Sequence, residues 1–255
     1  MQTSFQFLLK KNATRLTIAA VAAGSLLMTG CASAGVTGVS QTLVQPQARA
    51  DVIYVQAFDA SPDQVKLDSG IAQKLKTMVS GSSSANEQMQ AAQAAREEVS
   101  DEIVRQLQAK GLNAVHSDAP APANANALIV AGNFQKLDEG MRRRRMLIGL
   151  GAGKSEVGAS VQLLYKPAGG TPVLLETFTA DANSGHIPGM AESAGLGAAA
   201  GHIAMTAAAA ASVHGATEVK HTTLSGDAQR LGDSIAKQVL AANAANGWVP
   251  AAHAE

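Results

Sequence analysis

Cys31 is the only cysteine in the 255-residue chain, so no disulfide can form within it. Aromatic residues make up only 3% of the sequence, so the apolar interior must be built from Ala, Val, Leu and Ile. The fold must therefore be stabilised by an aliphatic core alone, and a chain of this length can bury a sizeable one.

The N-terminus has the layout of a secretory signal peptide. Lys10, Lys11 and Arg15 form a basic region without acids, and residues 16–28 form an apolar run. This run is shorter than the roughly 20 apolar residues that a membrane-spanning helix needs, so a permanent span is the weaker interpretation.

The apolar run ends in the sequence LMTGC, which closes at Cys31 and resembles the lipobox of bacterial lipoproteins. The resemblance implies that residues 1–30 are removed and that Cys31 carries acyl chains, palmitate among them, which anchor the protein to a membrane. Ala32 and Ser33 follow the cysteine where inner-membrane lipoproteins carry Asp, so we expect the periplasmic face of the outer membrane. The alternative is cleavage elsewhere, which would leave Cys31 as a free thiol.

The composition predicts one domain with appendages. After the signal peptide (residues 1–30), we expect a lipidated cysteine and flexible tether over 31–50, because this stretch is small, polar and without a strand or helix period. A single α+β domain over 51–249 follows, with an Ala/Gly-rich helical segment near 190–214 and a disordered tail over 250–255. Loss of the basic signal peptide leaves a small excess of acids, so nothing argues for nucleic-acid binding.

Apolar periodicity predicts the main elements of this domain. An amphipathic helix begins at the capping box Ser84 and Glu87, presents Met89 with the later apolar positions, and ends at Gly111. A closing helix starts at Ser225. Strands are expected over 52–55, 112–116, 128–137, 156–166 and 173–180, and a loop with at most one short helix over 61–84.

The last two strands flank a turn-rich connection and should pair as an antiparallel hairpin. The order of elements predicts an α+β fold in which a mixed, largely antiparallel sheet is covered by helices on one side.

Four arginines, Arg142, Arg143, Arg144 and Arg145, precede a loop that contains Gly149, Gly151 and Gly153. The run is interpreted either as a solvated loop or as a site for an anion or a partner protein, since guanidinium groups match phosphate geometry. The glycines are not a nucleotide-binding loop, because Ile148 stands where the first Gly is required and a strand follows instead of a helix. They fit a loop in which two backbone segments approach closely.

The Ala/Gly-rich segment over 190–214 has small residues at the spacing of close helix pairs, and as a helix it is long enough to enter a membrane. Glu192, His202 and His214 fall within it and oppose insertion. We expect one or two helices that pack on the sheet or on another copy, so a homo-oligomer stays open.

No catalytic or metal-binding pattern is evident, and we expect no cofactor. The six histidines form no H-x3-H pair and do not neighbour the cysteine. Ser184, Ser193 and Ser225 lack a nucleophile-elbow context.

Several features follow one another in a recognisable order: the stretch from Arg142 to Ser155, the strand after it, the hairpin, the Gly/Ala segment and the closing helix ending at Trp248. In this order the chain resembles the family called domain of unknown function 4410, over roughly residues 50–249. The resemblance implies an envelope lipoprotein without an assigned activity. More distantly, the layout is similar to lipoproteins that act as envelope assembly factors, which is an analogy of fold only.

Three functions follow as hypotheses. The first is a non-enzymatic, lipid-anchored periplasmic module that binds another envelope protein. The second is a membrane-active or pore-forming oligomer that uses residues 190–214, and the third is an enzyme acting on cell-wall or lipid substrates.

Overall fold

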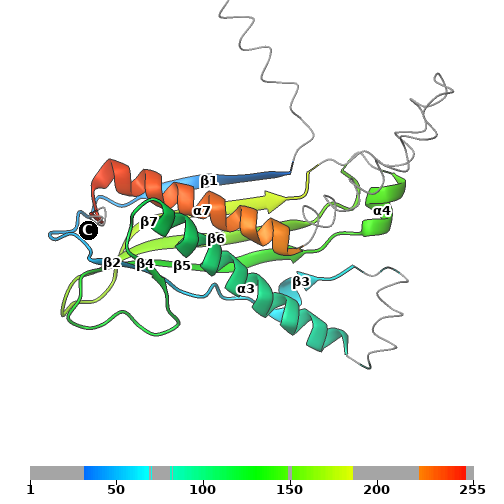
Figure 1. The fold of residues 1–255 in the computed structure, drawn as a ribbon, viewed down its shortest axis with the longest axis horizontal. Coiled ribbons are helices and arrows are strands. Elements are labelled where there is room, and N and C mark those ends of the chain that lie inside the picture. The colour runs from blue at the N-terminus through cyan, green and yellow to red at the C-terminus, as the bar shows by residue number, and fades with distance from the viewer. Residues whose placement is uncertain are drawn as a thin grey trace, which may run out of the picture. The chain divides into compact units, whose positions relative to one another are not determined.

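A computed structural model describes residues 32–68, 70, 81, 83–148, 151–185 and 224–250. The predicted signal peptide, Cys31, Gly149, the segment 190–214 and residues 251–255 lie outside the described residues. Within the described ranges, a seven-stranded sheet has the strand order β1-β7-β6-β5-β2-β4, and a short β3 pairs with β5 (Figure 1).

The strands are β1 (Ser33–Gln41), β2 (Val52–Val55), β3 (Val65–Lys66), β4 (Ala114–His116), β5 (Ala127–Asp138), β6 (Glu156–Lys166) and β7 (Val173–Asn183). The helices are α3 (Ser84–Ala109), α4 (Arg142–Leu147), α7 (Leu224–Asn246) and the 3₁₀ turn η1 (Pro62–Gln64). β1, β7, β6 and β5 are antiparallel, whereas β2 is parallel to both β4 and β5. The predicted α+β class, mixed sheet and antiparallel β6–β7 hairpin are confirmed.

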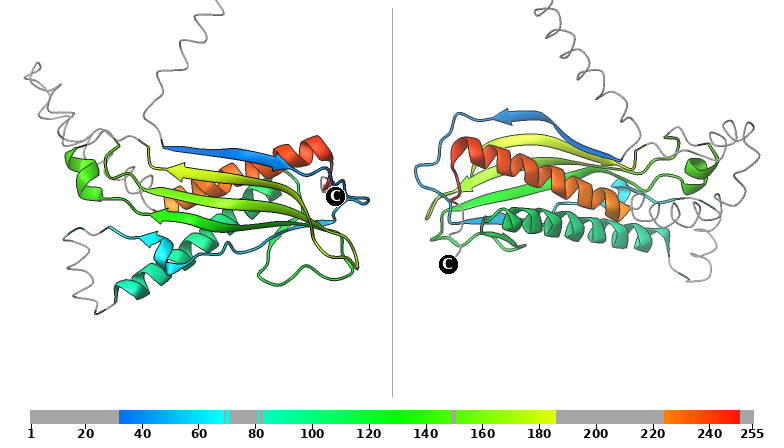
Figure 2. Two further views of the ribbon diagram at one scale, coloured as in Figure 1. Left: turned by 180° about the vertical axis from the view of Figure 1, so that it is seen from behind. Right: turned by 45° about the horizontal axis from the view of Figure 1, so that its top comes forward.

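Helices α3 and α7 lie side by side on one face of the sheet (Figure 2). Most side chains of the core are aliphatic, as the composition predicts, and five aromatic residues join them, Phe58, Phe134, Tyr165, Phe178 and Trp248. The core side chains of β6 alternate along the strand. The fully buried members include Val99, Ile103 and Leu107 of α3, Leu231, Ile235 and Val239 of α7, and Val157, Ala159, Val161 and Leu163 of β6.

The helix ends follow the sequence closely. Ser83, one residue before the predicted cap, accepts a hydrogen bond from the Asn86 N–H at 3.2 Å. Gly111 takes the positive φ expected after the last turn, and the Leu112 N–H donates to the Leu107 carbonyl. The prediction is wrong for Met89, which is 52% exposed. In the described part of the chain, the first turns of α3 lie against the two-residue strand β3 and the short turn η1, which cover little of the helix.

The tether predicted over 31–50 is wrong for residues 33–41, which form β1 along the edge of β7. Only Val36 in this strand is half-buried, so the hydrophobic pattern could not reveal it. Backbone hydrogen bonding to the free edge of β7 forms the strand, with Ser33 opposite Asn183. The folded domain therefore begins at residue 33 and not at residue 51.

A glycine in the middle of β5 makes room for a fully buried aromatic ring. Phe58 and Phe134 pack with ring centroids 5.8 Å apart. A Cβ added to Gly132 would lie 2.4 Å from a Phe58 ring carbon, and the ring is fully buried and cannot move aside. Phe58 therefore occupies space that only glycine at position 132 leaves open.

Gly132→Ala is expected to lower the free energy of unfolding by about 1–3 kcal/mol through overpacking, measured by urea denaturation. Gly35→Ala in β1 is the matched control, since no heavy atom lies within 4 Å of its Cβ position, and it should change stability by less than about 0.5 kcal/mol. Equal effects of the two substitutions would contradict this packing.

Candidate functional site

The four arginines form the helix α4, which joins β5 to β6, and not a loop. Arg, Met and Leu are good helix formers, and here their intrinsic preference is realised. Arg142, Arg143 and Arg144 are exposed, whereas Arg145 is only 5% exposed.

Arg145 has a structural role. Its Nη1 donates to the Glu139 carbonyl oxygen at 3.0 Å and to the Gly153 carbonyl oxygen at 2.7 Å. These charge-assisted hydrogen bonds close the connection between β5 and β6. The expectation that all four arginines are available to an anion or partner is therefore wrong for Arg145.

The predicted close approach of backbone segments is found at Gly153. Its carbonyl accepts the Met141 N–H at 2.9 Å, and a Cβ on this residue would lie 2.6 Å from the Met141 carbonyl. Gly140 faces the same contact, and its Cβ would lie 2.3 Å from the Gly153 carbonyl. Gly151 has a positive φ with open space around it, so it turns the chain without such a contact.

A buried carboxylate sits behind this loop. Asp227, in the first turn of α7, is fully buried and forms an ion pair with Arg230. Burial raises the pKa of the Asp227 carboxyl above its ordinary value of 3.8, while a hydrogen bond with Ser155 and the charges of Arg230 and Arg145 oppose the rise. The loop and α7 are therefore joined by buried charged groups.

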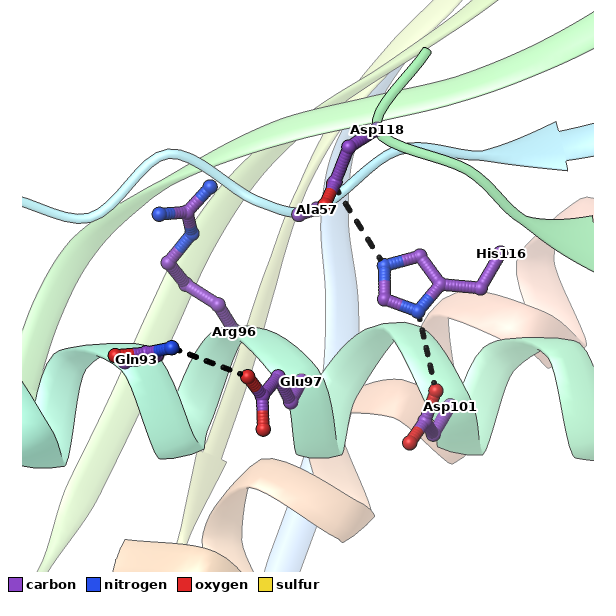
Figure 3. Close-up of a pocket in the computed structure, with 7 residues that line it drawn as sticks. All are labelled: Ala57, Gln93, Arg96, Glu97, Asp101, His116 and Asp118. Atoms are coloured by element: carbon purple, nitrogen blue, oxygen red, sulfur yellow. Dashed lines mark hydrogen bonds and ion pairs between the residues drawn. The ribbon is translucent and has the colours of Figure 1, made fainter.

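A second candidate site is a hollow of about 320 Å³ between α3 and the ends of β2 and β4 (Figure 3). His116 ends β4 with its Nδ1 3.2 Å from Asp101 and its Nε2 3.9 Å from Asp118. The Arg96 Nε is buried without a hydrogen-bond partner. The hollow is lined by Ala57, Gln93, Arg96, Glu97, Asp101, His116 and Asp118.

This hollow offers hydrogen bonds and charges of both signs, and the described residues that line it include no Ser, Thr or Cys that could act as a nucleophile. Within the part of the chain that the structure describes, no group of three His, Cys, Asp or Glu is placed to hold a metal ion. The chemistry of the hollow suits recognition of a polar or charged group.

This site was not predicted from the sequence, because the residues close to His116 along the chain form no pattern that would mark a site. The His116–Asp101 contact depends on β4 lying parallel beside β2, with α3 crossing above them. The available signal was the predicted order of strand, helix and strand, since a connecting helix commonly places two strands parallel and brings their carboxyl ends together.

Comparison with known proteins decides the family. A model of the family described as domain of unknown function DUF4410 matches residues 53–201, more than half of the chain. The chain belongs to the DUF4410 family. The resemblance seen in the sequence is thereby confirmed, and the matched part of this DUF4410 protein starts in β2, so β1 precedes it.

No curated protein matches this DUF4410 chain. Among solved structures, it is similar to a dodecamer of a PelC variant from Paraburkholderia phytofirmans, with 16% identity, 57% of this chain and 81% of that chain covered, and a TM-score of 0.31. It is also similar to a structure described as an uncharacterized protein, with 11% identity, 77% and 96% covered, and a TM-score of 0.28. Likenesses at these scores carry no information on function.

The raised pKa of Asp227 predicts a pH dependence of stability. Between pH 3.8 and the pKa of the folded state, the folded protein binds more protons than the unfolded chain, so the contribution of Asp227 to the free energy of unfolding falls as pH rises. The free energy of unfolding of the wild type minus that of Asp227→Asn should therefore be constant below pH 3.8 and decrease as the pH rises above that value. It should level off above the pKa of the folded state. Urea denaturation over a pH series measures this difference, and a rise with pH would contradict the assignment.

Proposed function

We propose that this DUF4410 protein is a lipoprotein, held by acyl chains on Cys31 at the periplasmic face of the outer membrane, that binds another envelope protein there. The lipobox-like sequence supports the anchor. The observation that carries the proposal is that Cys31 precedes β1 by two residues. Two residues span at most roughly 7 Å, so lipid on Cys31 would hold the sheet itself and not the end of a long tether.

A domain fixed in this way meets its partners at the membrane surface. The hollow beside His116 is a suitable recognition site, because the carboxylates of Asp101 and Asp118 are exposed and Arg96 offers an unpartnered N–H. Charged groups of both signs at the hollow can select a partner by charge complementarity. The proposal is therefore of a binding module with a defined orientation.

The two other hypotheses stay predictions. A membrane-active oligomer depends on residues 190–214, which lie outside the described residues. Among the residues that the structure does describe, no helix has the length and apolar character of a membrane span. An enzyme would need a nucleophile or an activated water at the His116 hollow.

The anchor is tested by membrane fractionation of the wild type beside Cys31→Ala, with the intact mass of the mature wild-type protein. We expect the wild type to begin at an acylated Cys31 and to fractionate with the outer membrane. The variant should be released or left uncleaved, because the residue that accepts the lipid is gone. A wild-type mass without lipid would overturn the anchor.

Binding is read out in the same cells with a photo-crosslinking residue at Gln93 of α3, which lines the hollow, and at Lys237 on α7 as a control. Both side chains are exposed and they belong to different helices. A discrete envelope protein joined to position 93 and absent from position 237 supports the binding module. Identical patterns at both positions, or none, count against it.

A further inference from the structure

The strand β1 fixes which end of the sheet lies next to the anchor. Ser33 is opposite Asn183, Asn183 is opposite Glu156, and Glu156 is opposite Asp138, so one row of residues crosses four strands. Neighbouring strands are about 4.8 Å apart, which places Asp138 roughly 14 Å across the sheet from Ser33. The start of β1 and helix α4 lie at the same end of the sheet in all views of Figures 1 and 2.

Helix α4 follows this row after Asp138 and carries exposed groups of two kinds. Arg142, Arg143 and Arg144 are exposed, and no side-chain hydrogen bond or ion pair engages their guanidinium groups in the described part of the chain. Large apolar side chains flank them on both sides. These are Met141, Leu147 and Ile148, with exposed fractions of 37%, 48% and 45%.

The nearby carboxylates each have other partners. Asp68 accepts the N–H groups of Gly70 and Arg142 at 3.0 and 3.2 Å, and Glu139 accepts the Asp68 N–H at 3.1 Å. Glu156 lies 2.9 Å from Lys136 and 4.0 Å from Lys154. Among the described residues, the exposed guanidinium groups of Arg142, Arg143 and Arg144 therefore have no carboxylate partner, whereas that of Arg145 is buried.

We propose that the surface made by Met141 to Arg144 with Leu147 and Ile148, here called the arginine tip, rests on the membrane and binds anionic phospholipid headgroups. The orientation of the tip toward that membrane rests on the proposed anchor at Cys31. Guanidinium groups pair with lipid phosphates, and apolar side chains beside them enter the headgroup region. The short path from Cys31 favours a lipid surface over an acidic protein, because the anchored chain presents this end to the bilayer.

Vesicle binding tests the arginine tip without the anchor. The probe is the full mature chain, residues 31–255 with Cys31→Ser, mixed with vesicles of phosphatidylglycerol and phosphatidylcholine or of phosphatidylcholine alone. We expect sedimentation with the anionic vesicles only. Joint replacement of Arg142, Arg143 and Arg144 by Gln should weaken binding by roughly 100-fold at low salt, since each basic residue near an anionic surface contributes about fivefold.

The matched control removes three exposed cations elsewhere, as Arg105→Gln, Lys110→Gln and Lys237→Gln, with the same change in net charge. It should retain most of the binding, and circular dichroism checks that both triple variants fold. Leu147→Gln with Ile148→Gln should reduce the binding that persists at high salt.

Three outcomes would overturn the arginine tip. The first is an equal loss of vesicle binding in both triple variants, and the second is equal binding of the wild type to vesicles with and without anionic lipid. The third is that the wild type binds no vesicles while the substitutions in the arginine tip abolish crosslinking to a protein partner. Because the vesicle assay uses an unlipidated chain, its result is independent of the proposed anchor. Failure of the anchor instead shows as a mature protein without lipid on Cys31.

Discussion

The pairing of β1 with β7 sets the organisation of the whole domain. Without it, β7 would expose a row of free N–H and C=O groups along its length, and residues 33–41 would be free chain. With it, the folded domain begins two residues after the predicted lipid attachment site. One set of backbone hydrogen bonds therefore completes the sheet and decides which end of it the anchor would hold.

The interior shows how a chain with few aromatic residues reaches close packing. Glycine and alanine let segments approach in ways that larger side chains would prevent. A Cβ on Gly232 of α7 would lie 3.0 Å from the Val99 carbonyl of α3, so the two helices are in near backbone contact. In β5, Gly132 leaves the space that the Phe58 ring fills. Small residues thus give the aliphatic core its density.

Much of the fold could be predicted because its central elements bury one face. The observed bounds of β6 are those expected from its alternation, and α7 begins one residue before the predicted Ser225. β1 could not be predicted, since its edge position requires little apolar burial. α4 was missed because four adjacent arginines carry no apolar period. Of the candidate site, the exposed Arg142 to Arg144 were indicated by the sequence, whereas the His116 hollow depends on a parallel strand pairing that only the fold reveals.

Hydrogen exchange at β1 in the mature, lipidated protein tests the central claim most directly. If the anchored chain enters the sheet at once, the amides of residues 33–41 that bond to β7 exchange far more slowly than those of the connecting residues 43–48. Exchange of both segments at the same fast rate would show that residues 33–41 are a free tether. The arginine tip would then have no fixed orientation toward the membrane.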